Sequence, residues 1–191
     1  MTPYFGQAAD YLIGTVFSIY LTIVMLRALF GYLRVDFYNP ISQFVVRATN
    51  PLLRPLRRAI PGFRGIDWAV IVLLVVLQIL ALLLTRSLSG LPVGPLGLLF
   101  LAIGELLSLL FKIFLGAVFI QVILSWFGGG RYSPLNPILD AITEPLLDPI
   151  RRFLPSIGGL DFSPLALIIL LQLSQILLVG PILDIGSRLA V

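Results

Sequence analysis

Residues Thr49–Asp67 read TNPLLRPLRRAIPGFRGID, and residues Thr143–Asp161 read TEPLLDPIRRFLPSIGGLD. Ten of the 19 aligned positions are identical. Unrelated segments of this length share about one or two residues by composition alone, so the similarity indicates an internal duplication. Because a repeat decides how the rest of a chain is organised, the fold depends on what surrounds these two copies.

The composition indicates a membrane protein. Of the 191 residues, 59% are hydrophobic and 12% are charged, whereas soluble domains contain about 25% charged residues. The chain has no cysteine and no histidine, which excludes disulfides, thiolate nucleophiles and metal sites built on those side chains. We therefore expect a protein that is not an enzyme and that binds no cofactor.

Four apolar stretches are long enough to cross about 30 Å of hydrocarbon. They are expected near residues 11–33, 68–85, 100–127 and 164–184. Between the second and third stretches, SGLPVGPLG contains three glycines and two prolines. Residues 88–97 are therefore predicted to form a loop or interfacial segment, with a re-entrant segment or an additional span as the alternatives. Asp67 is predicted to be the N-cap of the second span.

Each copy thus consists of a span, a basic segment and a second span. Subtracting 94 from the numbers of the second copy places Arg151, Arg152 and Asp161 on Arg57, Arg58 and Asp67. Two spans per copy make the repeats parallel, related by an axis along the membrane normal. We expect an all-α membrane protein with four transmembrane helices, in which residues 1–97 and 98–191 are the two repeats.

The basic residues are distributed unevenly around these spans. Nine of the 13 Lys and Arg residues lie in or beside the two repeated segments. The opposite side has only Arg86 and Arg188, while Arg27 and Lys112 fall within spans. Since cytoplasmic loops carry an excess of Lys and Arg, the repeated segments are predicted to be cytoplasmic and both termini to lie outside.

The repeated segments are also amphipathic. In the first copy, apolar residues recur every three or four positions from Ile41 to Ala59, opposite a face of polar residues and arginines. Such a stripe lies flat at a lipid boundary. Asn39 and Asn50 are predicted helix caps, each followed by a proline at a helix start. Pro55 is predicted to break or kink the helix that begins at Pro51, so we expect short helical pieces.

The arginines of these segments have two interpretations. They either only fix the topology, or they bind anionic lipid headgroups or a partner protein. The candidate residues for binding are Arg54, Arg57, Arg58, Arg151 and Arg152.

Polar residues inside the spans are candidates for function, namely Arg27, Lys112, Gln78 and Gln172. Arg27 lies about 10 Å deep by helix rise and is able to snorkel to the surface. Lys112 lies about 22 Å deep and either pairs with Glu105 or belongs to a conduction pathway. The glutamines either bridge helices or line a pore.

Acidic residues of the second segment suggest two further hypotheses. Asp140, Glu144 and Asp148 form a stripe at helical spacing, which is either a solvated face or a site for a hard cation. Asp148 aligns with Arg54 of the first copy. Homologous positions approach each other near a pseudo-twofold axis, so these two residues are a candidate pair that joins the copies.

The doubled pattern of Asn-Pro, Pro-Leu-Leu, Arg-Arg, Pro and Asp, together with FYNPISQFVV and GGLDFSPL, resembles the YggT family of bacterial inner-membrane proteins. The resemblance covers both copies and nearly the whole chain. It extends to the YlmG proteins of Gram-positive bacteria, cyanobacteria and plastids.

The resemblance implies an inner-membrane protein tied to osmotic and potassium tolerance. As an alternative, it implies a scaffold for division, nucleoid organisation or cytochrome b6 assembly, and it transfers no active site. The expected partners are the lipid bilayer, anionic headgroups, other inner-membrane proteins and further copies of the chain. Direct binding to nucleic acid is not expected.

Overall fold

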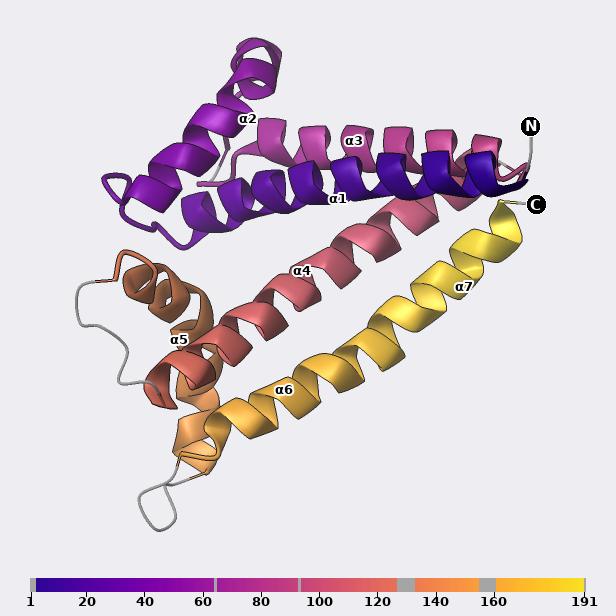
Figure 1. The fold of residues 1–191 in the computed structure, drawn as a ribbon. Coiled ribbons are helices and arrows are strands. Elements are labelled where there is room, and N and C mark those ends of the chain that lie inside the picture. Colours follow the sequence, from indigo (N-terminus) through magenta and orange to yellow (C-terminus); the bar gives the residue numbers. More distant parts are fainter. Residues whose placement is uncertain (1–2, 64, 93, 127–132, 155–160, 191) are drawn as a thin grey trace.

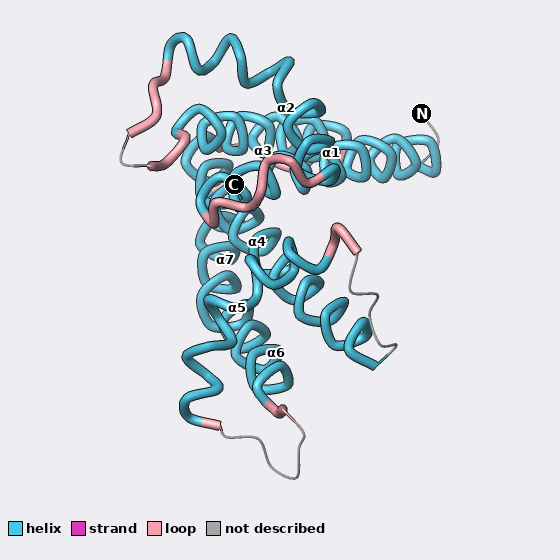
Figure 2. The backbone as a smooth tube through the Cα atoms, turned by 90° about the vertical axis from the view of Figure 1, so that its left-hand side faces the viewer, coloured by secondary structure: helices cyan, strands magenta, loops and turns pink. Residues whose placement is uncertain are grey.

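The structure is a computed structural model that describes residues 3–63, 65–92, 94–126, 133–154 and 161–190. Helices make up nearly all of this part of the chain (Figure 2). In chain order they are α1 (Pro3–Tyr32), α2 (Pro40–Ala59), α3 (Trp68–Leu88), α4 (Pro95–Trp126), α5 (Asn136–Phe153), α6 (Ser163–Ser174), the π-helix η1 (Gln175–Val179) and α7 (Gly180–Leu189).

Four helical segments among the described residues are long and apolar enough to cross a membrane: residues 4–32, 68–88, 95–126 and 163–189. The last of these consists of α6, η1 and α7 in continuous succession. This confirms an all-α membrane protein with four spans. The first helix begins earlier than predicted, because its only early helix breaker, Pro3, occupies the first turn, where a missing N–H costs nothing.

The repeats are parallel, as Figure 1 shows. Helices α2 and α5 lie at one end of the molecule, and both termini lie at the other. The end that carries α2 and α5 is called the amphipathic end below. Each repeat therefore crosses the membrane toward the amphipathic end, forms one amphipathic helix there and crosses back.

Each repeat also closes around the same buried contact. In the first, Val24, Leu53 and Leu73 join α1, α2 and α3 in one cluster. The positions 94 residues later are Val118, Leu147 and Leu167, which join α4, α5 and α6. All six side chains are buried. The duplicated sequence thus folds into two copies of a three-helix unit, each stabilised by burial of apolar side chains from its amphipathic helix.

Helices α2 and α5 are continuous, and the prediction of short helical pieces was wrong. Pro51 and Pro55 lie inside α2, and both are exposed. Their rings therefore free backbone carbonyls on a face where water or headgroups are available as partners. The opposite face holds the helix in place, because Val45, Thr49 and Leu53 recur every four residues and are all buried.

The predicted loop at residues 88–97 is shorter than expected, because α4 already begins at Pro95. Gly97, which the sequence pattern marked as a loop residue, lies inside this helix. A Cβ at Gly97 would come within 2.2 Å of the Ala190 backbone nitrogen. The glycine is required for close packing of α4 on α7, as small residues are at many membrane helix interfaces.

Gly104 and Gly186 extend the same interface. A Cβ at Gly104 would lie 2.6 Å from a Leu183 methyl group, and one at Gly186 would lie 2.8 Å from the Leu101 backbone nitrogen. The N–H of Gly94 also donates a hydrogen bond to the carbonyl of Ala190, at 3.1 Å. The second repeat is thus held together near the C-terminus by the close approach of the α4 and α7 backbones.

The two repeats meet along α3 and α4, and also at the amphipathic end. Asn39 caps α2 by accepting a hydrogen bond from the Ile41 N–H at 2.9 Å, which confirms the predicted cap. Its amide also donates to the carbonyl of Pro134 in the other repeat. A buried cluster drawn from α1, α2, α4 and α5 surrounds this junction, and its members include Phe30, Val45 and Ile142.

Candidate functional site

An arginine–aspartate pair links the end of α2 to the start of α3. Arg57 lies in the last turn of α2, and its Nε donates to Asp67 Oδ2 at 3.0 Å, while a terminal nitrogen of the guanidinium contacts the same oxygen. Asp67 occupies the N-cap position of α3, as predicted, but its side chain makes no capping hydrogen bond. The carboxylate instead joins the two helices, because the guanidinium offers a stronger, charge-assisted hydrogen bond.

The second repeat contains the same pair. Arg151 Nε lies 3.2 Å from Asp161 Oδ2, and Arg151 also contacts Asp148 at 3.5 Å. Burial of the Asp161 carboxyl opposes its ionisation. Hydrogen bonds from Ser163 and Arg151 outweigh this and hold the pKa of Asp161 below its ordinary value. Since Asp148 pairs with Arg151 on its own helix, the proposed Arg54–Asp148 link between the repeats was wrong.

These pairs divide the predicted lipid-binding arginines into two groups. Arg57 and Arg151 are bound to carboxylates and serve the fold. Arg54, Arg58 and Arg152 are exposed and form no ion pair within the described residues. Of the five predicted candidates, these three are the free cations in the part of the chain that the structure describes. The signal that sequence reasoning missed is the spacing of ten residues between each paired arginine and its aspartate.

A polar pocket lies inside the membrane region, between α1, α3 and α4. Its volume is about 270 Å³, and its polar lining consists of Ser18, Gln78, Thr85, Glu105 and Lys112. Gln78 stands near the middle of the 21-residue α3, so the pocket is deep in the hydrocarbon layer. The structure thus brings together the predicted candidates Gln78 and Lys112. Glu105 joins them, which the sequence had linked only to Lys112, and so do Ser18 and Thr85.

Glu105 and Lys112 both line this pocket but do not form the predicted ion pair. No nitrogen–oxygen contact within 4 Å joins them, although both belong to the described part of α4. They are seven residues apart on one helix, about 10 Å by helix rise. The pocket therefore holds an acidic and a basic group that are both available to a third group.

The remaining intramembrane candidates have different surroundings. Arg27 is half-buried near the amphipathic end, and its Nε is buried without a hydrogen-bond partner. Gln172 is exposed on the outer face of α6. Gln121 bridges two helices, since it accepts a hydrogen bond from Thr143 at 2.8 Å and donates one to Asp140 at 3.0 Å. Gln175 points to the carbonyl of Ser108 at 3.5 Å.

Together, these features define a class of protein: a multi-pass membrane protein built from two parallel repeats, each made of a span, an amphipathic helix and a span. A family model described as CCB3/YggT matches residues 7–88 and 100–182, once for each repeat. The chain belongs to this family, as the resemblance of its doubled motif implied.

Relatives in several bacteria match most of the chain. An uncharacterized protein of Pseudomonas aeruginosa is 47% identical over 92% of this chain and 90% of its own length. An uncharacterized protein of Vibrio alginolyticus is 41% identical over 92% and 97%. The uncharacterized protein YggT of Escherichia coli K12 is 38% identical over 84% of each chain. No solved structure matches the chain.

Proposed function

We propose that the protein is a non-enzymatic component of the bacterial inner membrane that supports osmotic tolerance and potassium homeostasis. The observation that supports this most is the polar pocket of Ser18, Gln78, Thr85, Glu105 and Lys112. Ionisable groups inside a membrane are costly and mark pathways for ions, protons or polar ligands. The osmotic role implied by the family resemblance agrees with such a pocket.

The proposed mechanism is modulation rather than conduction. The pocket has a volume of about 270 Å³, and its walls come from three helices. A space of this size holds a few small groups and is not a continuous pore. An ion pathway through this fold requires several subunits, so a conducting form is a homo-oligomer. A non-conducting form changes the activity of another ion-handling membrane protein, through what binds in the pocket beside Glu105 and Lys112.

The experiment is complementation of a deletion strain grown at high osmolarity with limiting potassium. The wild-type gene should restore growth, and Lys112→Ala should not. Gly14→Leu should also fail, because Gly14 lines the pocket and a Cβ there meets nothing within 4 Å, so leucine fills the pocket without straining the fold. Gly6→Leu, equally unhindered on the same helix but outside the pocket, is the control and should restore growth.

Full growth of the Lys112→Ala and Gly14→Leu strains would contradict the role of the pocket. Purified protein in liposomes with a potassium gradient then separates the mechanisms. We expect no flux above that of protein-free liposomes. Flux that is carried by the wild type and changed by Lys112→Ala or by Gln78→Leu/Gln172→Leu would establish conduction instead.

We also propose the orientation, with the amphipathic end in the cytoplasm and both termini in the periplasm. The support is the bias of Lys and Arg toward that end. Reporter fusions within residues 39–67 and 136–161 should both read as cytoplasmic, and fusions beside Arg86 or at the C-terminus as periplasmic. Opposite readings from the two segments would contradict the orientation.

A second candidate function is a scaffold for other membrane complexes, which the free cations Arg54, Arg58 and Arg152 favour. If these arginines dock a partner, a larger complex should co-purify with the wild type and be lost when all three are changed to alanine. Arg57 and Arg151 are left intact, since their loss would disturb the fold as well. A complex that survives this change would count against the scaffold.

A further inference from the structure

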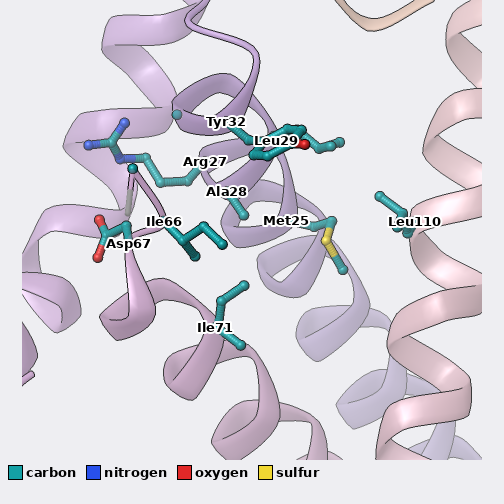
Figure 3. A pocket seen from close by; sticks show the side chains of 11 residues that line it. Met25, Arg27, Ala28, Leu29, Tyr32, Ile66, Asp67, Ile71 and Leu110 are labelled. Carbon is teal, nitrogen blue, oxygen red and sulfur yellow. The ribbon is translucent and has the colours of Figure 1, made fainter. Parts of the chain in front are cut away.

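Two pockets occupy equivalent places in the two repeats. The first, of about 310 Å³, lies where α1 ends and α3 begins (Figure 3). The second, of about 560 Å³, lies where α4 ends and α6 begins. Subtracting 94 places Gln121, Ser125, Trp126, Asp161 and Leu165 of the second on Arg27, Gly31, Tyr32, Asp67 and Ile71 of the first. The duplicated fold therefore builds the same pocket twice.

The first pocket is amphiphilic. Figure 3 shows Arg27 and Asp67 together on one side, with the side chains of Met25, Ile71 and Leu110 on the other. Arg27 stands five residues before the end of α1, about 8 Å from it by helix rise. Its polar side is thus at the depth where phospholipid headgroups join their acyl chains, and its apolar side faces the hydrocarbon.

The polar side carries one unneutralised positive charge. Arg57 and Arg27 both lie beside Asp67, but the structure pairs the carboxylate with Arg57. Arg27 forms no ion pair within the described residues, and its Nε is shielded from solvent without any hydrogen-bond partner. A half-buried cation without a partner is costly, and an anion placed beside Arg27 would remove that cost.

The second pocket differs from the first at the charged position. Gln121 stands where the first pocket has Arg27, and both ends of its amide are satisfied, by Thr143 and Asp140. The arginine that lines the second pocket, Arg151, contacts two carboxylates, those of Asp148 and Asp161. The second pocket thus lacks the unpartnered cation, although it lies at the equivalent place and has a larger volume.

We propose that the first pocket binds one anionic phospholipid molecule, with the lipid phosphate at Arg27 and an acyl chain along Met25, Ile71 and Leu110. Charge complementarity selects an anionic lipid, because two guanidinium groups face a single carboxylate. The apolar wall selects a lipid over a free phosphate, since it stabilises only a ligand with a hydrocarbon chain. Tyr32, which is 72% exposed, lies at the rim, where interfacial aromatic residues are common.

Three variants test this site. Arg27→Gln gives the first repeat the residue of the second, and Arg27→Lys keeps the charge without the planar guanidinium. Gly31→Phe fills the pocket, because Gly31 lines it and a Cβ there meets nothing within 4 Å. Gly116→Phe, equally unhindered but outside the pocket, is the matched control.

The measurements are native mass spectrometry of the detergent-purified protein and its thermal unfolding with added phosphatidylglycerol, phosphatidylcholine or glycerol phosphate. The wild type should retain one phosphatidylglycerol and unfold at a higher temperature with that lipid than with the other two ligands. Arg27→Gln and Gly31→Phe should weaken retention at least tenfold. Arg27→Lys and Gly116→Phe should stay within about threefold of the wild type.

Several outcomes would overturn the proposal. Equal stabilisation by phosphatidylcholine would mean that the pocket is an apolar groove that does not select an anionic lipid. Equal stabilisation by glycerol phosphate would mean that it is a site for small anions. Undiminished retention in Arg27→Gln or in Gly31→Phe would exclude the pocket itself. If Arg27→Gln unfolds without lipid, as judged by circular dichroism, Gly31→Phe decides, because it leaves every charge in place.

Discussion

The two repeats have the same contacts between the amphipathic helix and the spans. They differ in how the two spans of each repeat pack against each other. Each repeat has three buried apolar residues at equivalent positions: 24, 53 and 73 in the first, and 118, 147 and 167 in the second. Each also pairs an arginine with an aspartate ten residues later. Only the second packs its two spans through glycine, since Gly14 of α1 has open space around its Cβ position. Duplication has preserved the connection between amphipathic helix and span, while the span-to-span contact has diverged.

Residues at equivalent positions have also acquired different surroundings. Gln78 lines the polar pocket, whereas Gln172, its counterpart, is exposed on the outer face of α6. The Arg27 Nε has no hydrogen-bond partner among the described residues, whereas Gln121 has two. The candidate functional groups thus lie where the repeats differ, and the shared residues build the scaffold.

The largest expected effect of a single substitution comes from breaking the glycine contact that only the second repeat has. Gly97→Leu should destabilise the protein by about 3 kcal/mol or more, at the upper end for overpacking, because its Cβ would overlap the Ala190 backbone. For a chain of this length, 3 kcal/mol corresponds to a lowering of the unfolding temperature by about 6–12 °C. Thermal unfolding in detergent, followed by tryptophan fluorescence, measures the change.

Two glycines outside this contact serve as controls. Gly116→Leu on the same helix and Gly14→Leu in the first repeat add the same side chain where a Cβ meets nothing within 4 Å. Both should unfold within about 2 °C of the wild type, since changes away from packed contacts are worth about 0.5 kcal/mol or less. Equal losses in all three variants would show that leucine itself, and not the contact, is responsible.

Much of this fold was predictable from local patterns. Four spans follow from the length of the apolar stretches, parallel repeats follow from two spans per copy, and the Asn39 cap follows from the residue type before a proline. Each depends on a few neighbouring residues, so one sequence suffices. The free arginines Arg54, Arg58 and Arg152 were predictable as basic residues on an amphipathic helix.

The predictions that were wrong concern residues whose partners are distant. Gly97 was interpreted as a loop residue, but it packs against Ala190 inside α4. Pro55 was interpreted as a helix breaker, but it lies on the exposed face of α2, whose opposite face is buried. Asp67 does stand at the N-cap of α3, but its carboxylate binds Arg57 instead of capping the helix. Asp148 was assigned to the other repeat because the rotation of each helix was unknown. The polar pocket was missed as a unit for the same reason: its five polar residues come from three helices.

A second prediction concerns the π-helix η1, which α3 of the first repeat lacks. Pro181 has no N–H and its ring displaces a carbonyl one turn earlier, and the Gly180 N–H donates to Gln175 five residues back. A π turn holds one residue more than an α turn. Deletion of Leu177 combined with Pro181→Ala should therefore give a regular helix with unfolding within about 4 °C of the wild type.

Deletion of Leu170 combined with Pro181→Ala is the matched comparison. Leu170 and Leu177 are both exposed, but Leu170 lies in the regular part of the span. Its loss rotates everything after it by about 100°, which turns Gly186 away from Leu101. This variant should lose the folded state, seen as aggregation in size-exclusion chromatography. If both deletions behave alike, the π turn does not accommodate an extra residue.

A third, smaller effect is expected at the arginine–aspartate pair that both repeats retain. Arg57→Glu places two carboxylates side by side and should lower stability by about 1 kcal/mol, the upper range for pairs that are about one-third exposed. Adding Asp67→Arg restores opposite charges and should recover most of the loss. Arg58→Glu, on the exposed neighbour without an ion pair among the described residues, should cost less than half as much.

The smallest expected effect is the pH dependence of the second pair. The pKa of Asp161 lies below its ordinary value, so its ionised form stabilises the fold at a pH above the unfolded-state pKa of about 3.9. This contribution is lost as the pH falls through the folded-state pKa. Asp161→Asn should therefore unfold slightly below the wild type at pH 7, by less than about 1 kcal/mol because the carboxylate is 41% exposed. The difference should shrink steadily below pH 4. A difference that persists unchanged at pH 2.5 would mean that the side chain acts through its shape and not through its charge.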